Sequence, residues 1–139
     1  MTPAPFAIRS PATGAEFAAC YALRYQILRE PLGQPPGSER DPLDAGAYHL
    51  MAVTPAGEVI GAGRLHLAGP GTGQIRFMAV APAWRGRGVG RAILSGLEAR
   101  AREWGLASLA LNARDPAVDF YLAAGFHVAG EGPTMFGTL

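Results

Sequence analysis

A turn rich in glycine and arginine, WRGRGVGRAIL, joins a predicted strand to a strongly amphipathic predicted helix. Its glycines are Gly86, Gly88 and Gly90, and its arginines are Arg85, Arg87 and Arg91. Glycine lets backbone N–H groups approach a ligand closely. The helix that follows adds unpaired donors and about half a positive charge at its first turn. Like charges crowded there are unfavourable without an anion, so the turn predicts a site for a phosphate or pyrophosphate.

Several known phosphate-binding patterns do not fit this turn. The dinucleotide pattern G-x-G-x-x-G places Arg91 at its sixth position when counted from Gly86, and Ile93 when counted from Gly88. A P-loop needs a lysine, and all 12 basic residues of the chain are arginine. A net charge of +1 and a single basic turn argue against nucleic acid. The residues alone therefore indicate a ligand that bears phosphates, most simply a cofactor.

The first part of the chain predicts a strand, a helix and a long loop. The strand covers residues 6–9. Thr13 and Glu16 then stand at capping-box spacing at the start of a helix that runs to about Arg29. Residues 31–46 are rich in proline, glycine and acids, and predict a loop with at most one short helical turn.

An antiparallel set of strands should lead into the turn. The predicted strands cover residues 49–54, 58–67 and 74–80. In the last of them Ile75, Phe77 and Ala79 alternate with Gln74, Arg76 and Met78, a pattern that is typical of a β-strand.

The chain beyond the turn alternates helix and strand. A helix is predicted over residues 89–104 and a nearly all-apolar central strand over 106–112. Asp115, followed by proline, should begin a helix that ends at Ala124, and residues 126–130 should form a last strand. The order predicts one α/β domain over residues 1–139, with a mixed sheet and a crossover helix between strands four and five.

Two segments resemble motifs of the GNAT superfamily of acyl-CoA-dependent N-acetyltransferases, in its small, bacterial-type single-domain form. VAPAWRGRGVGRAIL, residues 80–94, is similar to motif A, [QR]-x-x-G-x-[GA]. The residues that meet this pattern are Arg85, Gly88 and Gly90. LNARDPAVDFYLAAGF, residues 111–126, is similar to motif B. The resemblance covers nearly the whole chain. It implies a GNAT-like fold, with a mostly antiparallel central sheet flanked by helices and with strands four and five parallel but splayed apart after a bulge.

The resemblance also implies acetyl-CoA as the cosubstrate, and no metal. The residues expected to hold the pyrophosphate of coenzyme A are Arg85, Gly86, Arg87, Gly88, Val89, Gly90 and Arg91. The pantetheine arm would pair with the edge of strand four at Met78, Ala79 and Val80, and Asn112 would line the same cleft. The N–H near Val80 would stabilise the oxyanion of a tetrahedral intermediate. Tyr121 would contact the cofactor and protonate the departing thiolate, since a phenol with a pKa of about 10 holds its proton at neutral pH.

The implied reaction is direct transfer of the acetyl group to a primary amine on a small molecule, peptide or protein. Its general base is not evident, because strand four offers Gln74 and Arg76 but no carboxylate. The alternatives are Glu39, Asp41, His49 and His66. Acids in GSERDPLD could also contact a cationic amine. A non-catalytic acyl-CoA sensor or regulatory module stays open as the alternative, and a nucleic-acid binder with steep salt dependence is a third hypothesis.

The C-terminus departs from the family pattern. The chain stops at EGPTMFGTL, so the expected seventh strand is short or missing: absent, a stub over residues 135–139, or truncated. Strand six or five should then have an exposed edge, which a homodimer partner could cover.

Composition sets the remaining expectations. Hydrophobic residues make up 49% of the chain and charged residues 17%, as in globular proteins. The single cysteine, Cys20, excludes an internal disulfide and suits a reducing cytoplasm. The sequence MTPAPFAIRS has no signal-peptide pattern, and no window reaches the ~20 apolar residues of a membrane span. A cytoplasmic protein without a membrane partner is expected.

Overall fold

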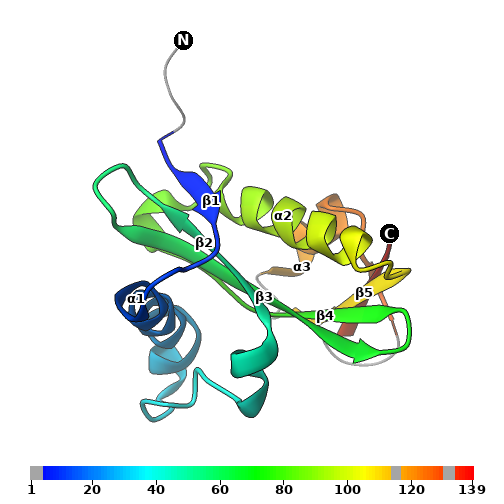
Figure 1. Cartoon of the computed structure of the whole chain (residues 1–139), viewed down its shortest axis with the longest axis horizontal. Helices are drawn as coiled ribbons and strands as arrows, with labels where there is room; N and C mark the ends of the chain where they lie inside the picture. Colours follow the sequence, from blue (N-terminus) through cyan, green and yellow to red (C-terminus); the bar gives the residue numbers. More distant parts are fainter. Residues whose placement is uncertain (1–4, 114–116, 130–133) are drawn as a thin grey trace.

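The computed structural model describes residues 5–113, 117–129 and 134–139, and these residues form one mixed sheet with helices on both faces (Figure 1). Within them the sheet has seven strands in the order β1-β2-β3-β4-β5-β7-β6. The strands are β1 (Ala7–Arg9), β2 (Tyr48–Val53), β3 (Val59–Gly69), β4 (Thr72–Val80), β5 (Ser108–Asn112), β6 (His127–Val128) and β7 (Thr134–Thr138). Only β4 and β5 pair in parallel; the other pairs are antiparallel. The predicted mixed, mostly antiparallel sheet is confirmed.

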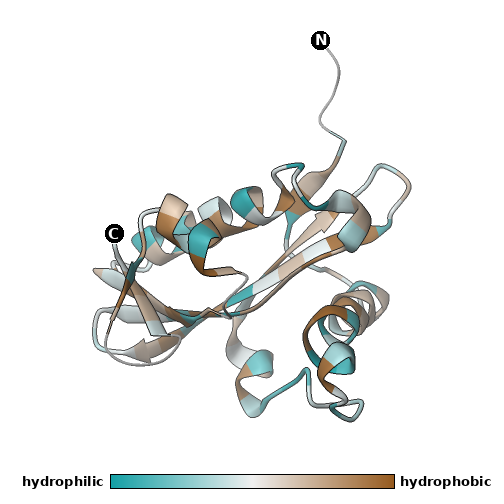
Figure 2. Cartoon of the chain, turned by 180° about the vertical axis from the view of Figure 1, so that it is seen from behind, coloured by the Kyte–Doolittle hydropathy of each residue, from teal (hydrophilic) through white to brown (hydrophobic). Residues whose placement is uncertain are grey.

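Helix α1 (Gly14–Arg24) lies on one face of the sheet, and α2 (Val89–Glu103) and α3 (Val118–Ala123) lie on the other (Figure 1). Figure 2 shows that the helices carry hydrophilic and hydrophobic residues on different sides. The buried stripe of α2 packs on β3, where Gly63 leaves room: a Cβ at this position would lie 2.7 Å from Ile93 Cγ2 and 2.6 Å from Met78 Sδ. The helix that follows the turn is therefore fixed closely to the sheet.

The start of α1 follows the predicted cap with one difference. Thr13 Oγ1 accepts a hydrogen bond from the Glu16 N–H at 3.1 Å, but the Glu16 carboxylate accepts from the N–H of Ala12 at 2.8 Å. Further along, Cys20 is buried against the sheet, and burial raises the pKa of its thiol to about 11. A buried thiol that keeps its proton packs in the core and is a poor nucleophile.

The end of this helical segment is less regular than the sequence indicates. After Arg24 the helix widens into the π-helical turn η1 (Tyr25–Arg29), and the 3₁₀ turn η2 (Glu30–Leu32) follows. The segment ends where predicted, but its last turn is not α-helical. The turn η1 contacts β4, which places Arg29 beside that strand.

The long loop of residues 31–46 begins within η2 and contains one further short helical turn, η3 (Pro42–Gly46). Two aspartates hold it in a reciprocal cap. Asp41 Oδ1 accepts from the N–H of Leu43 at 2.9 Å, and Asp44 Oδ2 accepts from the N–H of Asp41 at 2.8 Å. The cap fixes both carboxylates near each other.

A β-bulge interrupts β4. The β3–β4 register runs from Ala62 opposite Ala79 to Arg64 opposite Arg76, so two steps along β3 match three along β4. Phe77 lies within the extra step and has φ of +58°, the one positive φ outside glycine in the described part of the chain. An extra residue reverses the alternation of side chains across a sheet.

The predicted alternation of buried and more exposed residues is present in this strand, but the buried side chains do not all lie on one face of the sheet. Ile75 packs in the core beneath α2, whereas Ala79 belongs to the cluster that packs under α1. Phe77 also faces the α1 side, where its ring contacts Arg24. The three side chains do not share a face, because the bulge lies between the first and the third.

Strands β4 and β5 separate after a short paired stretch. Their register covers Thr72 opposite Ser108 through Ile75 opposite Leu111, while β4 continues to Val80. The splay implied by the resemblance is thus present. Among the described residues, none of β5 pairs with the last five residues of β4.

The C-terminal strand takes the form of a stub. Strand β7 pairs with β5 along its whole length, from Thr138 opposite Ser108 to Thr134 opposite Asn112, and with β6 on its other side. The sheet therefore ends at β6, and β5 is not an edge. The homodimer stays a prediction. The expected helix start at Asp115 lies outside the described residues.

In the described ranges, none of the helices has the length and apolar character that a membrane span requires.

Candidate functional site

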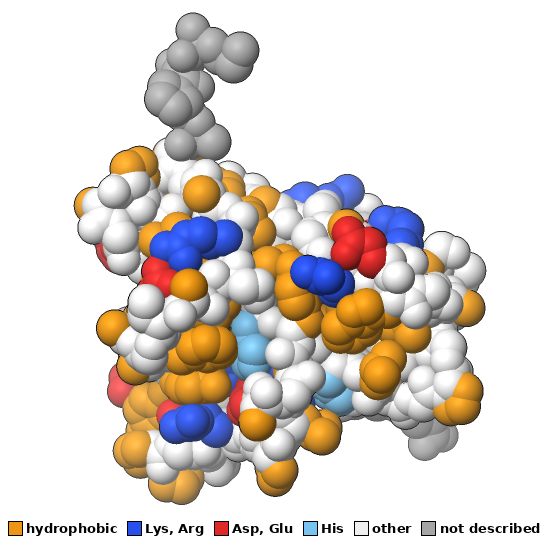
Figure 3. All heavy atoms as spheres, viewed as in Figure 1, with side chains coloured by type: hydrophobic (Ala, Val, Ile, Leu, Met, Phe, Trp, Pro, Cys, Tyr) orange, Lys and Arg blue, Asp and Glu red, His pale blue; other side chains and the backbone are white. Residues whose placement is uncertain are grey.

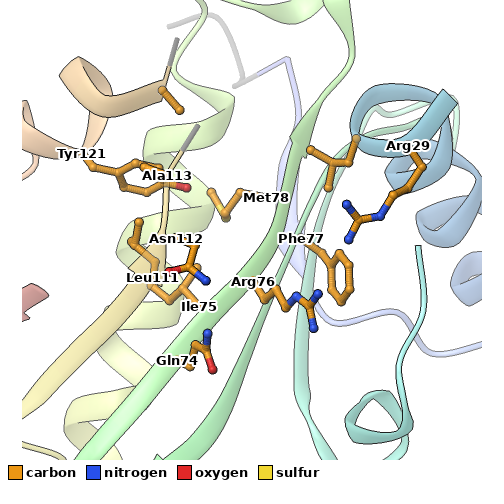
Figure 4. A pocket seen from close by; sticks show the side chains of 12 residues that line it. Arg29, Gln74, Ile75, Arg76, Phe77, Met78, Leu111, Asn112, Ala113 and Tyr121 are labelled. Carbon is orange, nitrogen blue, oxygen red and sulfur yellow. The ribbon is translucent and has the colours of Figure 1, made fainter. Parts of the chain in front are cut away.

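A cleft of about 270 Å³ opens where β4 and β5 separate (Figure 4). Its walls come from Gln74–Met78 of β4, from Leu111–Ala113 at the end of β5, from Arg29 of η1 and from Tyr121 of α3. Figure 4 shows Tyr121, Ala113 and Asn112 grouped on one side and Arg76, Phe77 and Arg29 on the other, with Met78 between them. None of the described lining residues carries a carboxylate.

Tyr121 is buried in the wall of this cleft. Its ring packs edge-on against Phe120 and Phe126, with centroids 5.0 and 5.8 Å away. Burial raises the pKa of the phenol to about 12, because the charged phenolate would be poorly solvated there. The hydroxyl therefore keeps its proton throughout the physiological pH range.

The other residues predicted along β4 and β5 divide into two groups. Met78 and Asn112 line the cleft, and Asn112 Oδ1 accepts a hydrogen bond from Thr134 Oγ1 at 3.1 Å. Ala79 is buried on the α1 face, so only its backbone could meet a ligand on the other side. Val80, opposite Gly61 at the end of β4, is half-buried against the α2 core. Ala79 and Val80 lie beyond the lined part of the cleft.

The glycine-rich turn leads into α2. Gly86 and Gly88 have φ of +75° and +81°, and no protein atom lies within 4 Å of where a Cβ would stand at either position. The first bond of the helix runs from the Ala92 N–H to the Gly88 carbonyl at 3.0 Å. The N–H groups of residues 89–91 precede that bond and are of the kind that a helix leaves unpaired. The backbone of the turn is therefore open to a ligand at two glycines with positive φ.

The side chains around the turn are exposed, and α3 adjoins it. Arg85, Arg87 and Arg91 face solvent, and the Arg87 guanidinium lies 4.9 Å above the Trp84 ring. A Cβ at Gly90 would lie 3.4 Å from Phe120, the neighbour of Tyr121. The predicted phosphate site and the predicted acid are thus on adjoining elements. On the face shown in Figure 3, basic side chains lie in separate places, unlike the continuous stripe of a nucleic-acid binder.

A buried ion-pair network lies on the face of the sheet that α1 covers. Arg64 donates to Asp41 through Nη1 (2.6 Å) and Nη2 (3.1 Å), and to Asp44 Oδ1 through Nη1 (3.1 Å). Arg24 Nη1 donates to Asp44 Oδ1 at 2.8 Å, and Arg76 Nη1 donates to Asp41 Oδ2 at 2.7 Å. The side chains of Arg24 and Arg64 are 1% and 0% exposed, whereas that of Arg76 is 45% exposed. The loop aspartates therefore bridge α1, β3 and β4.

The two carboxyl groups stay ionised in this network. Burial by itself would raise the pKa of Asp41, but the hydrogen bonds and charge of Arg64 outweigh it and the pKa is lowered. For Asp44, burial is likewise outweighed by the Asp41 N–H and by Arg24. A lowered pKa in the folded state means that these groups stabilise the protein at neutral pH, and that this contribution is lost as the pH falls below about 4.

The ring of Phe77 lies among four guanidinium groups. The distances from its centroid to the Cζ atoms of Arg76, Arg24, Arg64 and Arg29 are 4.5, 4.6, 4.9 and 5.7 Å. Each such contact contributes about 0.5–2 kcal/mol, depending on burial. Together they offset a backbone conformation that costs about 1–3 kcal/mol for a residue other than glycine.

The two histidines proposed as bases are held by arginines. His49 Nδ1 lies 3.1 Å from Arg24 Nη2, and His66 Nδ1 lies 3.1 Å from Arg64 Nη2. Guanidinium only donates, so each Nδ1 accepts and its lone pair is occupied. Nε2 of His49 then donates to the Asp44 carbonyl at 2.8 Å. Burial is the main cause that lowers the pKa of both rings, and hydrogen bonding opposes it only in part. Both rings are therefore neutral at pH 7.

None of the four candidate bases lines the cleft. Glu39 Oε2 accepts the N–H of Gly37 at 2.7 Å, and Asp41 is bound by two arginines. The acids of GSERDPLD thus serve the loop and the network. Within the described ranges, no cluster of three His, Cys, Asp or Glu side chains is placed to hold a metal ion.

Comparison with known proteins decides the family. The sequence model of the Acetyltransferase (GNAT) family matches residues 17–126. The chain belongs to the GNAT family. It is 30% identical over 111 residues to the uncharacterised N-acetyltransferase YjcF of Bacillus subtilis, a match that covers 80% of this chain and 78% of that protein.

Solved structures of GNAT proteins share its fold. A protein from Lactobacillus plantarum, provisionally named an N-acetyltransferase, superposes with a TM-score of 0.82 at 23% identity over 98% of this chain and 99% of its own. The PaiA N-acetyltransferase of Thermoplasma acidophilum, solved with coenzyme A, gives 0.78 at 14% identity over 96% of this chain and 99% of its own. The predicted GNAT fold is confirmed.

The ion-pair network yields a stability prediction. Asp44→Asn keeps the shape of the side chain but leaves Arg24 and Arg64 buried with one carboxylate fewer. Breaking a buried ion pair in this way typically costs about 3–5 kcal/mol, and we expect the free energy of unfolding in urea to fall by about that amount. Glu103→Gln, which removes the exposed partner of Arg100 on α2, should match the wild type. Equal stability of Asp44→Asn and wild type would contradict a structural role for the network.

Proposed function

We propose that this GNAT protein is an acetyl-CoA-dependent N-acetyltransferase that transfers the acetyl group directly to a primary amine. The observation that carries the proposal is the opening between β4 and β5, with the protonated phenol of Tyr121 in its wall. The opening lies beside an exposed edge of β4, and α3 joins it to the glycine-rich turn at Gly90.

The residues fit coenzyme A at three places. Open space at Gly86 and Gly88 lets the pyrophosphate reach the backbone N–H groups of the turn. The part of β4 from Met78 to Val80 leaves an edge on which the pantetheine arm can pair. The coenzyme A complex of the Thermoplasma acidophilum relative supports this choice of ligand.

Acetyl-CoA brings the activated acyl group as a thioester. The chain contributes a backbone donor, a proton donor and positive charge. The amine nitrogen bonds to the thioester carbonyl carbon while the N–H near Val80 stabilises negative charge on the carbonyl oxygen. The C–S bond then breaks, Tyr121 Oη gives its proton to the departing sulfur, and the proton that the amine releases returns to the tyrosine through water. The positive charge of Arg29 and Arg76 disfavours the protonated form of an amine in the cleft, so a water molecule can take the proton without a strong protein base.

The direct test is release of free thiol from acetyl-CoA in the presence of a panel of amines and peptides. Thiol release that depends on the amine supports the enzyme. The absence of a carboxylate among the described lining residues favours the alternative, a non-catalytic acyl-CoA sensor. Tight binding of acetyl-CoA without turnover on any acceptor would decide for the sensor.

Tyr121→Phe separates chemistry from binding. The substitution keeps the aromatic packing with Phe120 and Phe126 but removes the proton donor. We expect kcat to fall by about 100-fold or more, with the dissociation constant of acetyl-CoA close to that of the wild type by calorimetry. Tyr48→Phe, on β2 and outside the cleft, is the control and should keep its turnover. Unchanged kcat in Tyr121→Phe would mean that another acid, or none, serves the thiolate.

Gly88→Leu tests the turn. A side chain here covers the backbone donors and is strained at φ of +81°, so we expect calorimetry to detect no binding of coenzyme A. Gly105→Leu is a matched control: φ is +75°, no atom lies within 4 Å, and the residue follows the other end of α2. It carries the same strain and should bind coenzyme A normally. Wild-type affinity in Gly88→Leu would overturn the assignment.

A further inference from the structure

The acceptor side of the cleft is cationic. Arg76 and Arg29 are charged members of its lining, and no acid is among the described residues there. We propose that the acceptor carries an oxyanion group, a carboxylate or a phosphate, beside its amine, and that Arg76 binds that group. This inference rests on the proposed N-acetyltransferase function and names its substrate class.

The ion-pair network leaves Arg76 with charge to offer. Three guanidinium groups, those of Arg24, Arg64 and Arg76, share the carboxylates of Asp41 and Asp44. Asp41 already accepts from Arg64 through both of its oxygens, so it neutralises Arg76 only in part. One positive charge is in excess within this set.

Glu39, the other buried acid nearby, does not cancel that excess directly. Its carboxylate accepts the N–H of Gly37, and Arg24 Nη1 reaches its backbone carbonyl at 3.4 Å. Arg24 and Arg64 are buried, whereas the side chain of Arg76 is 45% exposed. The excess charge is therefore presented to a ligand at Arg76.

The geometry of Arg76 suits an oxyanion. A guanidinium has five N–H donors in a planar fork. Arg76 uses Nη1 to donate a hydrogen bond to Asp41 Oδ2 at 2.7 Å. Asp41 and the Phe77 ring, 4.5 Å from Arg76 Cζ, hold the group in place on the cleft wall. A fixed fork can bind a carboxylate or phosphate through two parallel hydrogen bonds.

This charge is separate from the predicted coenzyme A contacts. No residue of the turn, 85–91, lines the cleft, so the pyrophosphate has its own arginines. The pantetheine arm and the thioester are neutral and need no cation. Figure 4 shows Arg76 and Arg29 across from Tyr121, so an acceptor bound at Arg76 can direct its amine toward the tyrosine.

The experiment compares acceptors in matched pairs that differ in one anionic group. The pairs are free amino acids against their carboxamides and phosphoethanolamine against ethanolamine, with spermidine as a cationic acceptor. We expect kcat/KM for the anionic member to exceed that of its partner by about 10-fold or more, and spermidine to be a poor acceptor. The pair with the larger ratio identifies carboxylate or phosphate. Equal use of both members of each pair, or preference for spermidine, would overturn the proposal.

Variants of Arg76 locate the selectivity. Arg76→Gln should bring the ratio within each pair close to one, mainly through a higher KM for the anionic member, and Arg76→Lys should restore part of the ratio. Arg100→Gln, with a side chain 41% exposed on α2 and paired with Glu103, is the matched control and should keep the wild-type ratio. A wild-type ratio in Arg76→Gln would contradict the role of Arg76.

Failure of the proposed function would be recognised separately. If acetyl-CoA binds but no acceptor is turned over, the oxyanion site is tested by titrating the coenzyme A complex with N-acetylglycine and with N-acetylglycinamide. Tighter binding of N-acetylglycine in the wild type, and not in Arg76→Gln, supports the site in a non-catalytic protein. Equal binding of the two compounds overturns it.

Discussion

Strand β4 carries one residue more than the stretch of β3 opposite it, and Phe77 takes up the difference at a positive φ. The extra residue reverses the alternation of side chains, so Phe77 faces α1 while Met78 faces the cleft and the α2 core. Phe77 lies two residues beyond Ile75, the last residue of β4 that pairs with β5. The site, its opening and its cationic wall all depend on this local change of register.

The arginines hold the strained residue in place, and the loop aspartates hold the arginines. Arg24 comes from α1 and Arg64 from β3, and both contact the face of the Phe77 ring while sharing Asp44. A planar guanidinium can stack on a ring and bridge two carboxylates at once, which a lysine ammonium does less well. The network thus ties the long loop to the cleft, and it occupies Asp41, His49 and His66, three of the four residues that the sequence offered as general bases.

Much of the fold could be predicted because its signals are local. The stripe of α2, the cap at Thr13 and the glycine turn each depend on residues within a few positions of one another. The structure places all three where they were expected, and only the Glu16 carboxylate differs, since it accepts from Ala12. The resemblance implied a bulge before the splay, but its position at Phe77 could not be read from the residues, because Ile75 and Phe77 are both buried and the burial pattern looks like regular alternation. Nothing in the sequence near either residue indicates that they lie on opposite faces.

The network escaped prediction for a different reason. Arg64 is 20 residues from Asp44 and 23 from Asp41 along the chain, and a buried arginine has no local signature. From the sequence, Asp41 looked like a loop charge, and His49 and His66 looked like histidines of the sheet. Only the folded arrangement shows that these groups satisfy one another, and that Arg76 is the member exposed to a ligand.

We propose that the acyl group is transferred in the opening between β4 and β5. A crystal structure with bound coenzyme A would test this proposal. We expect the pyrophosphate against the backbone of residues 86–91, the pantetheine arm along β4 near Val80, and the sulfur within hydrogen-bonding reach of Tyr121 Oη. Coenzyme A bound elsewhere, or with its sulfur directed away from Tyr121, would contradict it.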